Sequence, residues 1–191
     1  MNIFYLDRNP AKAAEYHVDK HCVKMILESA QLLSTAHRIL DGLGAQKVYN
    51  PTTNRSVTRY WIPDERETLL YNATHVNHPS AKWCRETNMN YYWLWQLMRE
   101  LCTEYTYRYE KIHKCESTGL LARLRFWPKN IPIGEFTDPT PAMPDQYKVK
   151  GDGVQSYRNY YNGEKQRMFS WKKRQVPEFI NKTTGENYAN I

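Results

Sequence analysis

The chain lacks the features that mark a disulfide-rich, secreted or membrane-spanning protein. Its 191 residues include four cysteines that are widely spaced and form no C-x-x-C pair. This pattern is typical of reduced thiols rather than of a disulfide framework or a zinc site. The first residues, MNIFYLDRN, contain no long apolar run or cleavage pattern, so we expect no signal peptide. Because no stretch approaches the length of a transmembrane helix, we predict a cytoplasmic protein without membrane contact.

The sequence also contains few residues at the spacing that metal ligands have on a helix. Among the six histidines, His17 and His21 in the run HVDKH have the four-residue spacing that suits two ligands on one helical face. We predict that one helix ends and another begins between these two residues, which removes that geometry. The sequence therefore predicts no metal site, and we expect no cofactor.

Acidic residues are outnumbered by basic ones. The chain has 27 Lys and Arg against 20 Asp and Glu, which gives a formal net charge of +7. A basic balance favours an anionic partner, and nucleic acid is the first candidate. The 15 Tyr and 6 Trp could stack on bases beside the cations. Aromatic residues also fill protein cores, so composition alone leaves both interpretations open.

The length is sufficient for one domain with a substantial core, and we find no internal repeat. We predict a mainly α, compact, single-domain helical bundle over residues 1–191, with a short extended N-terminus over residues 2–6. Residues 1–125 form the helical core in this prediction. Residues 126–191 form an irregular Pro-rich wrap, which contains Pro128, Pro132, Pro139, Pro141 and Pro144, followed by a basic and aromatic helix.

Caps and hydrophobic periodicity predict where the helices lie. Asn9 and Pro10 open a short helix that continues to about Tyr16. Asp19 caps the next helix, which runs to about Leu40 and stops at the sequence DGLG. We expect further helices over residues 64–72, from Pro79, over 90–114 and over 153–172, a long loop at 45–64 and a frayed tail from Asn181.

The helix from Asp19 to Leu40 carries the candidate reaction centre. His21 and Glu28 lie two turns apart, at one margin of its polar arc. Partial desolvation at such a margin shifts pKa values, so Glu28 is a candidate acid or base and His21 a candidate for orienting a substrate or moving a proton. The structural alternatives are an ion pair between Glu28 and Lys24 and a histidine that packs against a neighbouring helix. Spacing alone favours these alternatives.

Basic and aromatic residues alternate in the C-terminal part of the chain. They are Tyr157, Arg158, Tyr160, Tyr161, Lys165, Arg167, Trp171, Lys172, Lys173 and Arg174. Such interleaving suits a surface that stacks on bases and contacts phosphates, but an amphipathic helix that docks its aromatics on the core gives the same pattern. On the long preceding helix we expect Lys111 and Lys114 to face solvent or phosphate, and Glu104 and Arg108 to form an i,i+4 ion pair.

Three motifs occur in the order DKHCVKMILESAQLL, NHPSAKW and NYYWLWQLMRELCTEYTYRYEKIHK. Together they resemble the pyrimidine-dimer DNA glycosylase family typified by phage endonuclease V, over about residues 1–115, with a weaker echo in YRNYYNG. The resemblance implies a compact all-α enzyme of a bacterial cell or a phage-infected host. Such an enzyme breaks the bond between base and sugar, and then cleaves the DNA backbone through an imine to its N-terminal amine.

The resemblance implies a role for four residues of this chain. Asp19 and His21 match an Asp-x-His pair, Glu28 falls on the catalytic carboxylate, and the α-amine of Met1 takes the place of the nucleophile. The chain also departs from the family. The residue after Met1 is Asn rather than a small residue, and Leu27 and Gln31 stand where the family has arginines beside the carboxylate. Substrate contacts must therefore differ, and a cyclobutane dimer is not assumed.

The sequence thus predicts a DNA glycosylase that excises a damaged or modified base, with lyase activity through the N-terminal amine as an added possibility. DNA is the expected partner, and the oligomeric state is left open. The expected DNA-binding residues are Lys20, Lys24, Lys111, Lys114, Arg158, Tyr160, Tyr161 and Lys165. Two alternatives remain: a non-catalytic DNA-binding protein on the same fold, and an enzyme that modifies a base or nucleotide without excising it.

Overall fold

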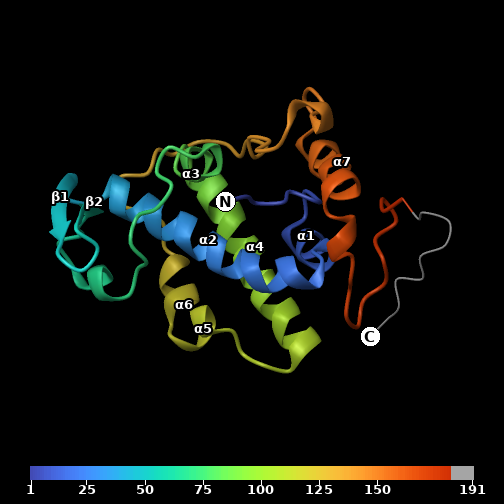
Figure 1. Ribbon diagram of the computed structural model, residues 1–191, viewed down its shortest axis with the longest axis horizontal. Helices are drawn as coiled ribbons and strands as arrows, with labels where there is room; N and C mark the ends of the chain where they lie inside the picture. Colours follow the sequence, from blue (N-terminus) through green and yellow to red (C-terminus); the bar gives the residue numbers. More distant parts are fainter. Residues whose placement is uncertain (182–191) are drawn as a thin grey trace.

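The computed structural model describes residues 1–181, and their fold is mainly α, as predicted (Figure 1). The helices are α1 (Pro10–Tyr16), α2 (Asp19–Leu40), α3 (Pro79–Cys84), α4 (Asn88–Tyr109), α5 (Lys114–Ser117), α6 (Leu120–Leu124) and α7 (Gly153–Glu164). An antiparallel pair of strands, β1 (Ala45–Asn50) and β2 (Arg55–Tyr60), follows α2. Short 3-10 turns are η1 (Glu65–Thr68), η2 (Asp145–Tyr147) and η3 (Gln166–Met168).

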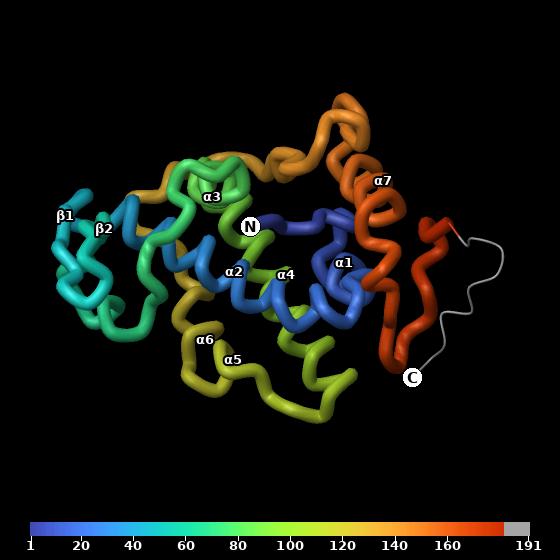
Figure 2. The backbone as a smooth tube through the Cα atoms, viewed as in Figure 1, coloured from blue at the N-terminus to red at the C-terminus, as the bar shows by residue number. Residues whose placement is uncertain are grey.

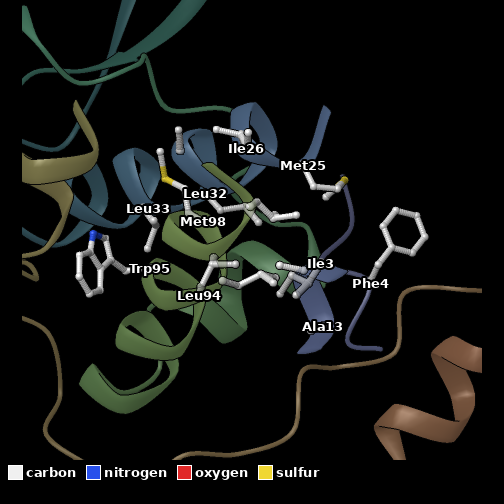
Figure 3. Close-up of a cluster of buried hydrophobic side chains, with 14 of the residues drawn as sticks. Ile3, Phe4, Ala13, Met25, Ile26, Leu32, Leu33, Leu94, Trp95 and Met98 are labelled. Atoms are coloured by element: carbon white, nitrogen blue, oxygen red, sulfur yellow. The ribbon is translucent and has the colours of Figure 1, made fainter. Parts of the chain in front are cut away.

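The long helices α2 and α4 pack on each other at the centre of the molecule, and α1 packs on α4 beside them (Figure 1). Figure 3 shows how side chains of α2, such as Leu33, gather with Leu94 and Met98 of α4. These side chains are fully buried or nearly so. Each stabilises the fold by roughly 1.5–3 kcal/mol relative to an exposed position, so the apolar stripe of each helix fixes how α2 and α4 meet.

The first residues form an extended, buried segment, as predicted. They lead from the neighbourhood of α4 toward α7 before α1 begins (Figure 2). Ile3 and Tyr5 are fully buried, and the Tyr5 ring packs edge-on against Trp93 of α4 at 5.0 Å between centroids. Phe4 has a positive φ of 53°, a backbone conformation that costs free energy in a residue with a side chain. Surrounding contacts therefore hold the start of the chain in one defined path.

Residues 45–64 are not the loop that the sequence predicts, because β1 and β2 form a hairpin there. Val48 lies opposite Val57 in the register, and Lys47 opposite Thr58. None of the hairpin residues is buried. The usual strand signal is alternation between an apolar buried face and a polar face. Strands without a buried residue lack this alternation, so the prediction of a loop was wrong for a physical reason.

Three predicted helices are shorter in the structure than in the sequence interpretation. The expected helix at 64–72 is reduced to η1, and α7 ends at Glu164 instead of residue 172. The long helix ends at Tyr109 because Glu110 takes the left-handed conformation, with φ 56°, and a new short helix starts after His113, whose ring nitrogen accepts from the Cys115 N–H.

The segment between α6 and α7 contains the prolines and runs without helix or strand over residues 126–144. It crosses the molecule past α3 before it reaches α7 (Figure 1). The indole N–H of Trp83 donates to the carbonyl of Thr137 at 2.9 Å, and the Asn90 carboxamide donates to the Thr137 hydroxyl at 3.0 Å. Beyond Asn181 the predicted tail lies outside the described residues. No helix within residues 1–181 combines the length and apolar character needed to span a bilayer.

Arg108 of α4 is fully buried at the junction between α1 and α2. Its Nε donates to Glu104 at 2.7 Å, which confirms the predicted i,i+4 ion pair. Its terminal nitrogens donate to the Asp19 carboxylate and to the carbonyls of His17 and Glu15, each at 2.9 Å. One guanidinium therefore satisfies the carbonyls at the end of α1 and fixes the start of α2 against α4.

Arg108→Met should lower the free energy of unfolding by about 3–5 kcal/mol, because it removes a buried guanidinium that donates to Glu104, to Asp19 and to the carbonyls of His17 and Glu15. Urea unfolding followed by circular dichroism measures the loss. Arg99→Met on the same helix is the matched control, since Arg99 pairs with Glu100 at the surface and such pairs contribute less than about 1 kcal/mol. Equal losses in the two variants would contradict the role of Arg108 as a buried anchor.

Candidate active site

A pocket of about 450 Å³ lies between the N-terminal segment, α2 and the region of α7 and η3. Its lining comes from separate parts of the chain: Met1, Asn2, Phe4, Lys20, His21, Lys24, Glu28, Ala142, Tyr160, Lys165 and Met168. Ligand pockets are usually of about 300–1,000 Å³. Because the lining contains a carboxylate, lysines and aromatic rings, the pocket combines a polar centre with flat apolar walls.

Glu28 is the buried carboxylate of this pocket, with 9% of its surface exposed. Its Oε2 accepts a hydrogen bond from the backbone N–H of Asn2 at 3.0 Å. Its Oε1 forms an ion pair with Nζ of Lys24 at 2.9 Å. The pair with Lys24 that was the structural alternative for Glu28 is therefore formed, but the carboxylate is held at the pocket rather than in open solvent.

The backbone N–H of Asn2 is bonded to the carboxylate of Glu28. Because Met1 directly precedes Asn2, its α-amine lies close to the same carboxylate. The side chain of Asn2 fixes this arrangement, because its amide donates to the carbonyl of Ala142 at 3.0 Å and its oxygen accepts from the Ile3 N–H at 2.8 Å. Burial lowers the pKa of nearby His78, the positive α-amine lowers it further, and the charge of Glu28 opposes both. The amine, the carboxylate and this imidazole therefore share one electrostatic neighbourhood.

His21 lines the same pocket as a buried, neutral imidazole. Burial lowers its pKa to about 3, and electrostatic interactions with His17, Lys165 and Lys24 add to that effect. Its Nδ1 lies 2.6 Å from the hydroxyl of Tyr161, and its ring stacks on Phe4 at 4.2 Å between centroids. His21 can thus exchange a hydrogen bond or present a flat face, but it does not offer a cation to a phosphate at neutral pH.

Aromatic rings form one wall of the pocket. The Phe4 ring lies nearly parallel to that of Tyr160, with 6.3 Å between centroids and 12° between planes. Lys165 donates to the Tyr160 hydroxyl at 3.1 Å and lies 4.4 Å from its ring centroid. This wall therefore offers flat π surfaces with a positive charge beside them, an arrangement that suits a base and its phosphate.

Asp19 lies outside the pocket lining, and other residues already occupy its carboxylate. Helix α2 is preceded by Val18 as its N-cap, without a side-chain hydrogen bond, so the predicted capping role of Asp19 is wrong. The carboxylate accepts from Arg108, from the Ser170 hydroxyl at 2.5 Å and from the Lys172 N–H at 3.0 Å. Asp19 therefore joins α2 to α4 and to the C-terminal segment, and we leave it out of the catalytic group.

The predicted DNA-binding residues divide into two groups. Those that line the pocket are Lys20, Lys24, Tyr160 and Lys165. Those that do not are Lys111, Lys114, Arg158 and Tyr161. Tyr161 is fully buried, and Arg158 donates to the Leu6 carbonyl and to Asp7, so both hold the fold around the pocket. Lys111 and Lys114 are exposed at the end of α4 and the start of α5.

Several pocket residues were absent from the sequence prediction, namely Asn2, Phe4, Ala142 and Met168. Asn2 acts through its backbone N–H, which any residue other than proline supplies, so no side-chain pattern could identify it. In the sequence, Phe4 cannot be distinguished from the other apolar residues of a buried segment. Its stacking on His21 depends on the path of the chain, which the sequence pattern does not contain.

No protein-family model, curated protein or solved structure matches the chain. The resemblance to pyrimidine-dimer glycosylases therefore stays a prediction from sequence motifs. Within the described part of the chain, no group of three or more His, Cys, Asp and Glu side chains is placed to hold a metal ion. The break between α1 and α2 does fall between His17 and His21.

Acid should destabilise the fold through its buried histidines. The folded pKa of His21 is about 3, against an ordinary value of 6.5, so the unfolded chain binds the proton first as the pH falls. His21 therefore contributes a loss of stability that begins near pH 6.5 and continues to about pH 3, at up to about 1.4 kcal/mol per pH unit. Burial lowers the pKa of His17 to about 4 and of His37 to about 3, and both add to the slope.

The slope of the unfolding free energy against pH reports how many protons the chain takes up on unfolding. We expect His21→Asn to reduce this number by nearly one between pH 6 and pH 5. Urea unfolding at intervals across that range measures the slope. His75→Asn, at an exposed position with positive φ that asparagine tolerates, is the matched control and should keep the full slope. An unchanged slope in His21→Asn would contradict the neutral, buried state of this ring.

Proposed function

We propose that the protein is a DNA N-glycosylase that excises a damaged or modified base. The observation that carries the proposal is the position of Glu28, which is buried at a pocket and bonded to the backbone N–H of Asn2 beside the α-amine of Met1. A carboxylate stabilises the positive charge that develops on the sugar as the base departs. It can also accept a proton from an attacking nucleophile.

The dimensions and lining of the pocket support a nucleotide that has left the base stack. Extrusion of a nucleotide costs a few kcal/mol, and stacking on aromatic side chains returns about 1–3 kcal/mol per base. Tyr160 supplies such a ring at the pocket, where the buried Phe4 lies nearly parallel to it. Lys20 and Lys165 supply positive charge at the same pocket, where they would bind the flanking phosphates. The positive net charge of the chain favours the same partner.

The lyase step in this proposal uses the α-amine of Met1 as the nucleophile. Its nitrogen forms a bond to C1′ of the sugar while the bond from C1′ to the base breaks, and the base leaves with that electron pair and takes up a proton. Glu28 accepts the proton that the amine loses. The sugar ring then opens as the C1′–O4′ bond breaks, which leaves a protonated imine while O4′ takes up the proton held by Glu28. Glu28, ionised again, removes the acidified C2′ proton, and the C3′–O bond breaks so that the 3′ phosphate leaves with that electron pair. The neutral ring of His21 would orient the sugar.

Glu28→Gln should lower excision by at least about 100-fold while DNA binding is retained, because the amide keeps the size of the carboxylate but loses its charge and basicity. The assay measures abasic-site formation in duplex oligonucleotides that carry a panel of damaged or modified bases. Glu100→Gln, an exchange at a surface ion pair, is the control and should excise at the wild-type rate. Binding without product on every substrate would instead favour the non-catalytic alternative.

Borohydride should trap a covalent adduct between the protein and a substrate whose base has been excised, because reduction converts the imine into a stable amine. Denaturing electrophoresis detects the adduct, and peptide mapping should place it at residue 1. Reductive methylation of the α-amine, checked by mass spectrometry, should abolish trapping. If excision proceeds and no adduct forms, the protein is a simple glycosylase that uses water, and the amine has no covalent role.

A further inference from the structure

The hairpin of β1 and β2 projects at one end of the longest axis of the molecule, beyond the C-terminal end of α2 (Figure 1). None of its residues is buried. A two-stranded hairpin without a packed face is marginal in water, so this one contributes little to the core. Packing of the core therefore does not account for the presence of this hairpin, whereas a role in binding would.

The charge of this ribbon has one sign. The stretch from Gly42 to Pro63 contains Lys47, Arg55 and Arg59 and no Asp or Glu. Among residues 1–181, no ion pair within 4 Å engages these three cations, although the charge of Arg59 does reach Glu67. Lys47 and Arg55 are exposed and can meet an external anion, and Arg59 is half-buried beside them. Cations along a ribbon also discourage edge-to-edge pairing with a second copy.

The register places side chains that can bind DNA on one face of the ribbon. Residues that lie directly opposite each other share a face, and the pairs here are Gln46 with Arg59, Val48 with Val57, and Asn50 with Arg55. We call these six residues the arginine face. Arginine and the carboxamides of Gln and Asn are the side chains that pair with base edges and phosphates, and the major groove admits a two-stranded ribbon.

Helix α2 joins this ribbon to the pocket and sets their separation. Glu28 lies in the middle of α2, and the helix continues for twelve residues to Leu40 before the hairpin begins. At 1.5 Å per residue this is roughly 20 Å, or about six base pairs at 3.4 Å each. This separation is short enough for one duplex that lies along the long axis of the molecule to span it.

We propose that the arginine face of the hairpin is a second DNA-binding element, which occupies the groove of the duplex about six base pairs to one side of the nucleotide in the pocket. The position relative to that nucleotide rests on the proposed function. The affinity of the hairpin for a DNA duplex does not, because it follows from the charge and register of the ribbon itself. The partner is duplex DNA rather than a protein strand.

The test compares two double variants of the full-length protein. The hairpin variant carries Arg55→Ala and Arg59→Ala, which lie on the arginine face. The control variant carries Lys12→Ala and Arg99→Ala, which remove the same net charge from exposed positions outside the hairpin. The probe is a 25-base-pair duplex with a central tetrahydrofuran abasic analogue, together with versions that are trimmed to four base pairs on one side or on the other. Circular dichroism checks that both variants fold.

For the wild-type protein and the control variant, we expect trimming on one particular side to weaken binding at least about 10-fold, because about six base pairs are needed to reach the hairpin. The hairpin variant should bind the full-length duplex as weakly as wild type binds the trimmed one. Its slope of log affinity against log salt should be smaller by about two, since each phosphate contact contributes about 0.9. A variant with Arg55→Lys and Arg59→Lys, which keeps both positive charges, should have the same salt slope as the wild-type protein.

Binding by the hairpin variant that equals that of the control variant, with the same dependence on duplex length, would overturn the proposal. Dimerisation of the wild-type protein through the hairpin, seen as a concentration-dependent mass that the hairpin variant lacks, would overturn it as well. Failure of the proposed function has a different signature. In that case no substrate yields an abasic site, while the affinity for duplex DNA still depends on Arg55 and Arg59.

Discussion

The hydrogen bond from the backbone N–H of Asn2 to the carboxylate of Glu28 is the contact on which the candidate site depends. A carboxylate held away from water needs partners, and Glu28 has two, one from the main chain and one from Lys24. The main-chain partner belongs to the first peptide groups of the chain. Satisfying this one buried charge therefore fixes the amino end of the protein beside α2, and the pocket forms around that junction.

The rest of the fold holds this junction from both sides. Ile3 and Tyr5 are buried, so the segment after Asn2 cannot leave α4 without exposing apolar surface. On the other side, Tyr161 of α7 meets the ring of His21. Phe4 has a strained positive φ and joins the N-terminal segment to this contact, because its ring stacks on His21. Strain of this kind persists only where the surroundings impose it, and here it directs an aromatic ring at the wall of the pocket.

The parts of the structure that follow from local sequence were predictable, and the parts that depend on distant contacts were not. The α2 helix, the helix break after Tyr16 and the Glu104–Arg108 pair follow from periodicity, caps and spacing. The hairpin was missed because its exposed strands lack a buried apolar face. The placement of Glu28 at a margin of α2 indicated a partly desolvated carboxylate, but its bond to residue 2 depends on tertiary structure that spacing cannot supply.

The neutrality of His21 decides how work is divided within the pocket. Burial keeps this ring uncharged, so the positively charged side chains at the site are those of Lys20, Lys24 and Lys165. Lysines at a rim can bind phosphates without entering the low-dielectric interior, where an unpaired charge is costly. In the proposed reaction, the carboxylate of Glu28 would face a sugar that neutral and aromatic groups position. Charge that develops on that sugar would find Glu28 as its nearest anion, which is the condition that excision of a base requires.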